Sequence, residues 1–115
     1  MEQKPPVSFR QLAGMDFRVL CEEADRFGFR MVAINSSQTA LCKSFLKNSP
    51  VHVGAAISFP LGQTSIAVKE FETRDAIENG ADEIDYVINI ARLKCGDTAY
   101  IEREMKAITE ICREH

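Results

Sequence analysis

The sequence predicts an α/β protein with a parallel sheet, and three observations support this fold class. Apolar segments of strand length alternate with amphipathic segments of helix length along the 115 residues. Their spacing of a few tens of residues is typical of right-handed βαβ units, which pack helices against a parallel sheet. The stretch GADEIDYVINI at residues 80–90 is apolar on both faces, as expected for a parallel strand covered on both sides.

The composition indicates one globular domain over residues 1–115. This length is enough for one hydrophobic core but not for two. Hydrophobic residues make up 45% and charged residues 27% of the chain, so disorder is not expected. The net charge of -3 is spread along the chain without a cluster of Lys or Arg, which argues against a nucleic-acid partner.

The cysteines and the N-terminus predict the cellular compartment. No CxxC pair occurs and no His lies at metal-ligand spacing, so we expect reduced thiols and no metal site. The first nine residues are polar and lack the apolar core of a signal peptide, and no apolar run has membrane length. We therefore expect a cytoplasmic protein without a membrane partner. The cysteines are Cys21, Cys42, Cys95 and Cys112.

Each element has its own start or stop signal. Asp16 is the expected N-cap of the first helix, Ser36 and Ser37 are expected to cap the second, and Gly28 and Gly80 end helices. The expected order is a weak strand at 7–9, a helix over 16–27, a strand over 29–34, a helix over 38–47, a strand over 51–59, a helix from 64 or 65 to about 79, the strand over 80–90, and a helix from 97 or 98 to the chain end.

Two of these helices carry apolar stripes that we expect to face the sheet. The charged residues of the helix that ends near residue 79, Lys69 among them, are expected in water. The inward stripes are Ile66, Ala67, Phe71 and Ile77 in that helix, and Ile101, Met105, Ile108 and Cys112 in the last one.

Asp85 is the residue of the 80–90 strand that needs an explanation. Alternation along a strand places it beside Val87 on one face, opposite Ile84 and Tyr86, and both faces are expected to be buried. A buried carboxylate must be paired, hydrogen-bonded or neutral, and each outcome shifts its pKa. Asp85 is therefore either a general acid or base, or a structural acid paired with Lys or Arg.

We expect about half of a parallel (β/α) barrel. Three to four strands cannot close such a barrel, which needs about eight strands and roughly 250 residues. No strand follows the last helix, so the Asp85 strand is expected at an open sheet edge unless another segment or chain covers it.

Other motifs exclude some chemistry. The loop Phe59-Pro60-Leu61-Gly62 follows a strand, where it is either a substrate loop or a turn that needs Pro rigidity and Gly freedom. Neither a phosphate-binding glycine motif nor a GxSxG elbow occurs. We expect His52 and His115 to be structural or exposed, and Asp82 and Glu83 to be structural or solvated.

Three segments together resemble the deoxyribose-phosphate aldolases. They are LCEEADRFGFRMVAIN from Leu20, VHVGAAISFPLGQTSIAVKEFETRDAIENGADEIDYVIN from Val51, and LKCGD from Leu93. The most specific pattern is FPLG followed by Lys69, Glu72, Ala76 and GADEID. The resemblance covers residues 20–111, and residues 1–14 match the family poorly.

The resemblance implies a class I aldolase with a (β/α)8 barrel. Such an enzyme reversibly joins acetaldehyde to glyceraldehyde 3-phosphate through a lysine Schiff base, with no metal and no cofactor. Its partner would be a small phosphorylated sugar or aldehyde. A lysine beside a second cation loses its proton and attacks the carbonyl, and a nearby carboxylate can move the protons. Asp85 matches the fourth-strand aspartate of the family, which takes part in that proton transfer.

Parts of the family's site have no counterpart in this sequence. The Schiff-base lysine belongs to the sixth strand, the activating lysine to the seventh, and the phosphate-binding glycine loops to the last two. The first strand is missing or replaced by residues 5–9. Ala33 stands where many members have Cys, and Ser36 stands where Pro is usual. We do not assign the nucleophile to a lysine on a predicted helix or loop, namely Lys43, Lys47, Lys69 or Lys94.

We therefore expect the N-terminal half of an aldolase barrel, which contributes Asp85 and is inactive alone. It would form a homo-oligomer or join a complementing half-barrel that supplies the lysines. One alternative is a non-catalytic half-barrel that dimerises through its open sheet edges. Another is a different aldolase or isomerase barrel.

Overall fold

The computed structural model describes the backbone of residues 9–115 and the side chains from residue 16 onward. The strands are β1 (Met31–Asn35), β2 (His52–Ile57) and β3 (Glu83–Tyr86). The helices are α1 (Phe9–Phe27), the 3-10 helix η1 (Ser36–Gln38), α2 (Thr39–Phe45), α3 (Ile66–Glu78), α4 (Ile90–Lys94) and α5 (Thr98–Arg113).

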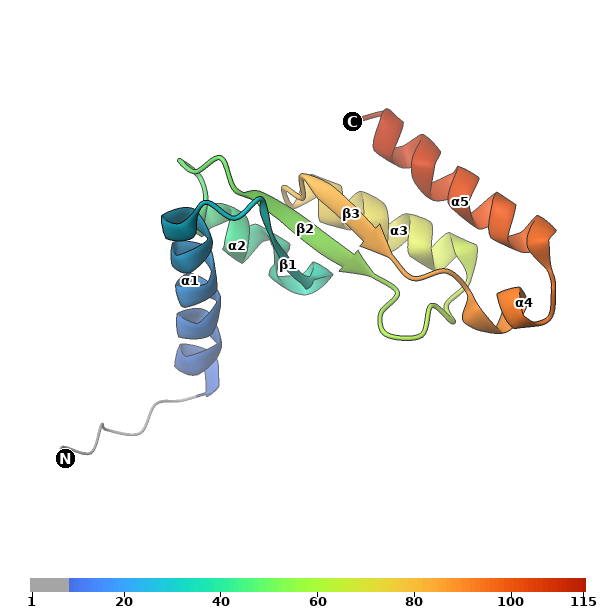
Figure 1. The fold of residues 1–115 in the computed structure, drawn as a ribbon, viewed down its shortest axis with the longest axis horizontal. Helices are drawn as coiled ribbons and strands as arrows, with labels where there is room; N and C mark the ends of the chain where they lie inside the picture. Colours follow the sequence, from blue (N-terminus) through green and yellow to red (C-terminus); the bar gives the residue numbers. More distant parts are fainter. Residues whose placement is uncertain (1–8) are drawn as a thin grey trace.

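The three strands form one parallel sheet in the order β1-β2-β3, and α2 and α3 lie behind it in Figure 1. In the register of this sheet, Asn35 pairs with Ala56, and Ala56 pairs with Asp85. The predicted parallel α/β class is confirmed. Within the described residues β3 is an edge strand, also as predicted.

Two apolar clusters attach the helices to the sheet. The first joins β1 and β2 to α1 and α2, and consists of Cys21, Ala24, Val32, Ile34, Cys42, Leu46, Val51 and Val53. The second joins β2 and β3 to α3, and consists of Ala55, Ile57 and Ala76 with Ala81, Ile84 and Tyr86 packed against it. Because side chains alternate along a strand, Asn35, Ala56 and Asp85 point to the opposite face, away from the helices.

The start of α1 differs from the prediction. The helix begins at Phe9 instead of Asp16, which lies exposed within it and is not an N-cap. Gly14 costs a helix about 1 kcal/mol relative to Ala, which is too little to end it. Val7 and Ser8, part of the expected weak strand, lie outside the described residues. None of the described helices is long and apolar enough to cross a membrane.

The expected serine caps on α2 are also wrong. Ser36 and Ser37 belong to η1, and the N-cap residue of α2 is Gln38, whose side chain makes no capping bond. Ser36 instead donates a hydrogen bond to Glu72, 2.8 Å away on α3. Ser65 and Asp97 do cap their helices, accepting bonds from the backbone of α3 and α5.

The apolar stripe of α3 was assigned to the wrong face. Lys69 is 0% exposed whereas Phe71 is 74% exposed, so α3 packs through its Lys69, Thr73 and Ala76 face. The stripe of α5 is correct at Ile101 and Ile108 but not at Met105, which is 50% exposed. Its buried residues are Ile101, Glu104, Ile108 and Ile111. The physical reason is that Lys69 and Glu104 neutralise each other, so both can be buried.

The buried thiol of Cys42 gives a pH-dependent stability. Burial, together with the adjacent Cys21, raises the pKa of the Cys42 thiol from the ordinary 9.0 to about 12. Between those two values the folded chain keeps a proton that the unfolded chain loses, so the free energy of unfolding should fall as pH rises above 9. Urea unfolding at stepped pH measures this. A Cys42→Ala variant with the same alkaline slope would contradict the assignment.

Candidate functional site

The candidate site lies at the carboxyl ends of the strands, where three loops meet. Asp85 is exposed there, on the sheet face away from the helices, in one row with Asn35 and Ala56. The predicted burial of Asp85 is therefore wrong, because the described residues cover β3 on the α3 side alone. The ion pairs of the described residues do not include Asp85.

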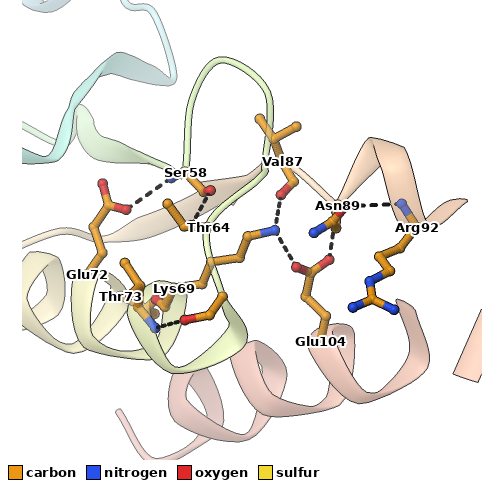
Figure 2. Close-up of polar contacts among 11 residues, drawn as sticks. Ser58, Thr64, Lys69, Glu72, Thr73, Val87, Asn89, Arg92 and Glu104 are labelled. Carbon is orange, nitrogen blue, oxygen red and sulfur yellow. Dashed lines mark hydrogen bonds and ion pairs between the residues drawn. The ribbon is translucent and has the colours of Figure 1, made fainter. Parts of the chain in front are cut away.

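A buried ion pair between Lys69 of α3 and Glu104 of α5 lies behind β3. Both side chains are 0% exposed. The ammonium of Lys69 also donates to the carbonyl oxygen of Val87, 2.8 Å away, and the other carboxylate oxygen of Glu104 accepts from the N–H of Asn89 at 3.0 Å (Figure 2). The pair thus binds the main chain directly after β3.

The ring of Tyr86 lies beside this pair. The Lys69 ammonium is 5.8 Å from the ring centroid, close enough for a cation–π attraction. Burial raises the pKa of Tyr86, and the negative charge of Glu104 raises it further. Within the described residues the Tyr86 hydroxyl has no hydrogen-bond partner.

A second carboxylate, Glu72 of α3, organises the loops after β1 and β2. Glu72 accepts from the Ser36 hydroxyl at 2.8 Å and from the N–H of Ser58 at 3.0 Å. Ser58 has a φ of 58°, a left-handed conformation that residues other than glycine rarely adopt. Its hydroxyl lies 2.6 Å from that of Thr64 (Figure 2). Glu72 therefore holds Ser58 at the start of the FPLG loop.

Gly62 brings the FPLG loop against the segment that follows β3. A Cβ at this position would lie 2.1 Å from the carbonyl oxygen of Ile88 and 2.7 Å from that of Val87, so no side chain fits. Gly62 also has a φ of 65°, which favours glycine. The FPLG loop therefore requires glycine at position 62, as expected for the turn interpretation. The loop also borders the candidate site.

The amino ends of the strands carry structural ion pairs. Asp82 accepts from Lys43 and from the N–H of Val53, both at 2.9 Å. Burial works to raise the pKa of the Asp82 carboxyl, but these bonds outweigh it and the pKa lies below the ordinary 3.8. Glu83 accepts from Arg30 at 2.9 Å and lies 3.0 Å from the ring nitrogen Nδ1 of His52. Asp82, Glu83 and His52 are therefore structural, as predicted.

The lysines of the described chain lie on helices or loops, as predicted. Lys43 is on α2, Lys47 follows α2, and Lys94 ends α4. Lys69 was expected to be exposed to solvent but is buried, and its ammonium group is paired with the carboxylate of Glu104. The described residues contain no group of three His, Cys, Asp or Glu side chains that could hold a metal ion.

Removal of the charge of Glu104 should destabilise the fold. Glu104→Gln leaves the Lys69 charge buried without a counter-charge and is expected to lower the free energy of unfolding by about 3–5 kcal/mol. The joint replacement Lys69→Met and Glu104→Met removes both charges and should cost less. Urea unfolding at neutral pH measures both. Arg74→Gln is the control, because Arg74 of α3 forms an exposed 3.5 Å pair with Glu114, the residue directly after α5. Equal stability of Glu104→Gln and the control would refute the assignment.

The Tyr86 hydroxyl should be dispensable for stability. Since it has no partner among the described residues, Tyr86→Phe is expected to leave the free energy of unfolding unchanged or to raise it by about 1 kcal/mol. Tyr100→Phe serves as the control in the same unfolding assay. A loss of about 1 kcal/mol or more, specific to Tyr86→Phe, would reveal a hydrogen bond at this hydroxyl.

Curated relatives of this chain are aldolases. A deoxyribose-phosphate aldolase of Lactobacillus acidophilus is 52% identical over 100 residues, which cover 87% of this chain and 42% of the relative. Another, of Bacteroides thetaiotaomicron, is 43% identical over 120 residues, which cover 93% of this chain and 50% of the relative. The chain thus spans half of these relatives' length or less.

Solved structures of aldolases superpose on the chain. A putative deoxyribose-phosphate aldolase from Coccidioides immitis gives a TM-score of 0.82 at 25% identity, over 97% of this chain and 42% of that one. The deoxyribose phosphate aldolase from Aeropyrum pernix, described as a tetramer, gives 0.80 at 26% identity, over 96% and 44%. The predicted class, about half of a parallel (β/α) barrel, is confirmed, and the chain covers slightly less than half of these structures. The pattern of the DeoC/LacD family aldolases matches residues 5–115, and the chain therefore belongs to this family.

Proposed function

We propose that this chain supplies the N-terminal half of a deoxyribose-phosphate aldolase barrel, in which Asp85 moves protons as the lysine Schiff base forms. The exposed position of Asp85 is the main observation that supports this proposal. Its carboxylate lies on the open sheet face near the carboxyl end of β3, where parallel barrels gather their catalytic groups. The neighbouring position on β2 is Ala56, a small residue that leaves room for a substrate.

The chemistry assigned to Asp85 is general acid and base catalysis. A lysine adds to the aldehyde carbonyl and gives a carbinolamine. The carboxyl group of Asp85 then protonates the hydroxyl of that intermediate, which leaves as water, and the lysine nitrogen forms the iminium. The carboxylate takes back a proton when the iminium is hydrolysed. Acetaldehyde and glyceraldehyde 3-phosphate are the proposed products of cleavage.

The nucleophilic lysine would come from the rest of the barrel. The relatives are about twice as long as this chain, and Lys43, Lys47, Lys69 and Lys94 lie on helices or loops. We therefore propose that the chain alone is inactive and acts with a complementing half, in a homo-oligomer or a longer protein. The four free cysteines are consistent with a cytoplasmic location.

A second candidate function is a half-barrel that binds another copy of itself without catalysis. The outer edges of β1 and β3 favour it, because both have unpaired backbone groups within the described sheet.

Borohydride trapping separates the two candidates. The chain is mixed with acetaldehyde and borohydride, alone and together with the C-terminal half of a family member. We expect no covalent label on this chain in either mixture, and a label on the C-terminal half in the second. Label on a lysine of this chain would refute its inactivity. No label and no aldolase activity in the second mixture would favour the non-catalytic half-barrel.

Asp85→Asn should lower turnover far more than stability. In a barrel completed with a C-terminal half, we expect kcat to fall by about 100-fold or more, because general acid and base catalysis contributes 10²–10⁴-fold. Replacement of an exposed side chain should change the free energy of unfolding by about 0.5 kcal/mol or less.

Glu83→Gln is the matched control for Asp85→Asn. Glu83 lies two positions earlier on the same face of β3 and forms an ion pair with Arg30. The Glu83→Gln substitution should leave kcat unchanged. Equal losses of turnover and stability in Asp85→Asn would favour a structural role for Asp85.

A further inference from the structure

We infer that Lys69 and Glu104 are positioning residues for Asp85, because they hold the main chain directly after β3. This inference rests on the proposed function of Asp85. Neither side chain touches the candidate site itself, since both are buried on the helix side of the sheet. They act through residues 87–89, which connect β3 to α4.

Both ends of the 87–89 segment are bound to buried groups. The N–H of Val87 donates to the carbonyl oxygen of Ile57 at 3.1 Å, which continues the pairing of β3 with β2. The carbonyl oxygen of Val87 accepts from Lys69 at 2.8 Å. Two residues later, the N–H of Asn89 donates to Glu104 at 3.0 Å (Figure 2). Lys69 and Glu104 thus replace the backbone partners that a strand or helix would have supplied.

The FPLG loop closes on the same segment. Gly62 approaches the carbonyl groups of Val87 and Ile88 so closely that a Cβ would overlap them. The loop and the ion pair therefore both restrain the 87–89 segment. Displacement of this segment would also move the end of β3, which carries Asp85.

The charged pair is better explained by these backbone contacts than by stability alone. A buried ion pair is often no more stabilising than apolar side chains of similar volume. An apolar pair could not bind a free carbonyl and a free N–H at once, however. A shift of about 1 Å at a catalytic group can cost about 100-fold in rate.

The first measurement uses the 115-residue chain. Amide hydrogen exchange by NMR is compared between the parent, Glu104→Gln, and the double variant Lys69→Met with Glu104→Met. We expect exchange at Asn89 to accelerate at least about tenfold in both variants, and the NMR signals of Asp85 to shift. Arg74→Gln should change neither. The double variant leaves no unpaired buried charge, so it reports on the segment even if Glu104→Gln does not fold.

The second measurement uses the barrel completed with a C-terminal half, assayed for cleavage of deoxyribose 5-phosphate. We expect kcat to fall at least about tenfold in the double variant while KM changes by less than about twofold, because substrate contacts remain. An unchanged kcat would overturn the positioning role. A fall in kcat accompanied by a rise in KM of similar size would overturn it as well.

The two measurements distinguish the two possible failures. A completed parental barrel without activity would refute the proposed function, while exchange at Asn89 and the Asp85 signals still report on the segment. Unchanged exchange and unchanged Asp85 signals in the double variant would overturn the inference even in an active enzyme.

Discussion

The ion pair between Lys69 and Glu104 is the interaction on which the arrangement of the strand ends depends. It joins α3 to α5 and binds the backbone at Val87 and Asn89. Both charges are withdrawn from water, and the attraction between them offsets the free-energy cost of this desolvation only while both are present. Their packing therefore specifies one relative position of the two helices and of the chain leaving β3.

Helix α3 connects all three loops at the carboxyl ends of the strands. Glu72 holds the loops after β1 and β2, and Lys69, three residues earlier and hence on nearly the same side of the helix, holds the segment after β3. Gly62 then brings the second loop against the third. The FPLG loop, Lys69 and Glu72 thus belong to one connected set of contacts, which reaches the segment directly after β3.

The sequence predicted the parallel α/β class, the edge position of the Asp85 strand and the C-terminal ends of α1 and α3, because periodicity and glycine stops are local signals. It did not predict the buried face of α3, nor the burial of Glu104 in α5. Lys69 was placed in water because its partner lies 35 residues away in the chain. The signal was present in α5, where Glu104 falls in register with Ile101, Ile108 and Ile111. The exposure of Asp85 was missed because alternation shows which residues share a face but not what covers it.

The ammonium group of Lys69 offers the most direct test of these contacts. A proton–nitrogen NMR spectrum of the lysine side chains at neutral pH measures how fast each ammonium exchanges its protons with water. The structure predicts slow exchange for Lys69, with a scalar coupling across the hydrogen bond to the carboxyl carbon of Glu104. An exposed lysine such as Lys47 should exchange fast. Fast exchange at Lys69 without that coupling would contradict the buried pair and the positioning role built on it.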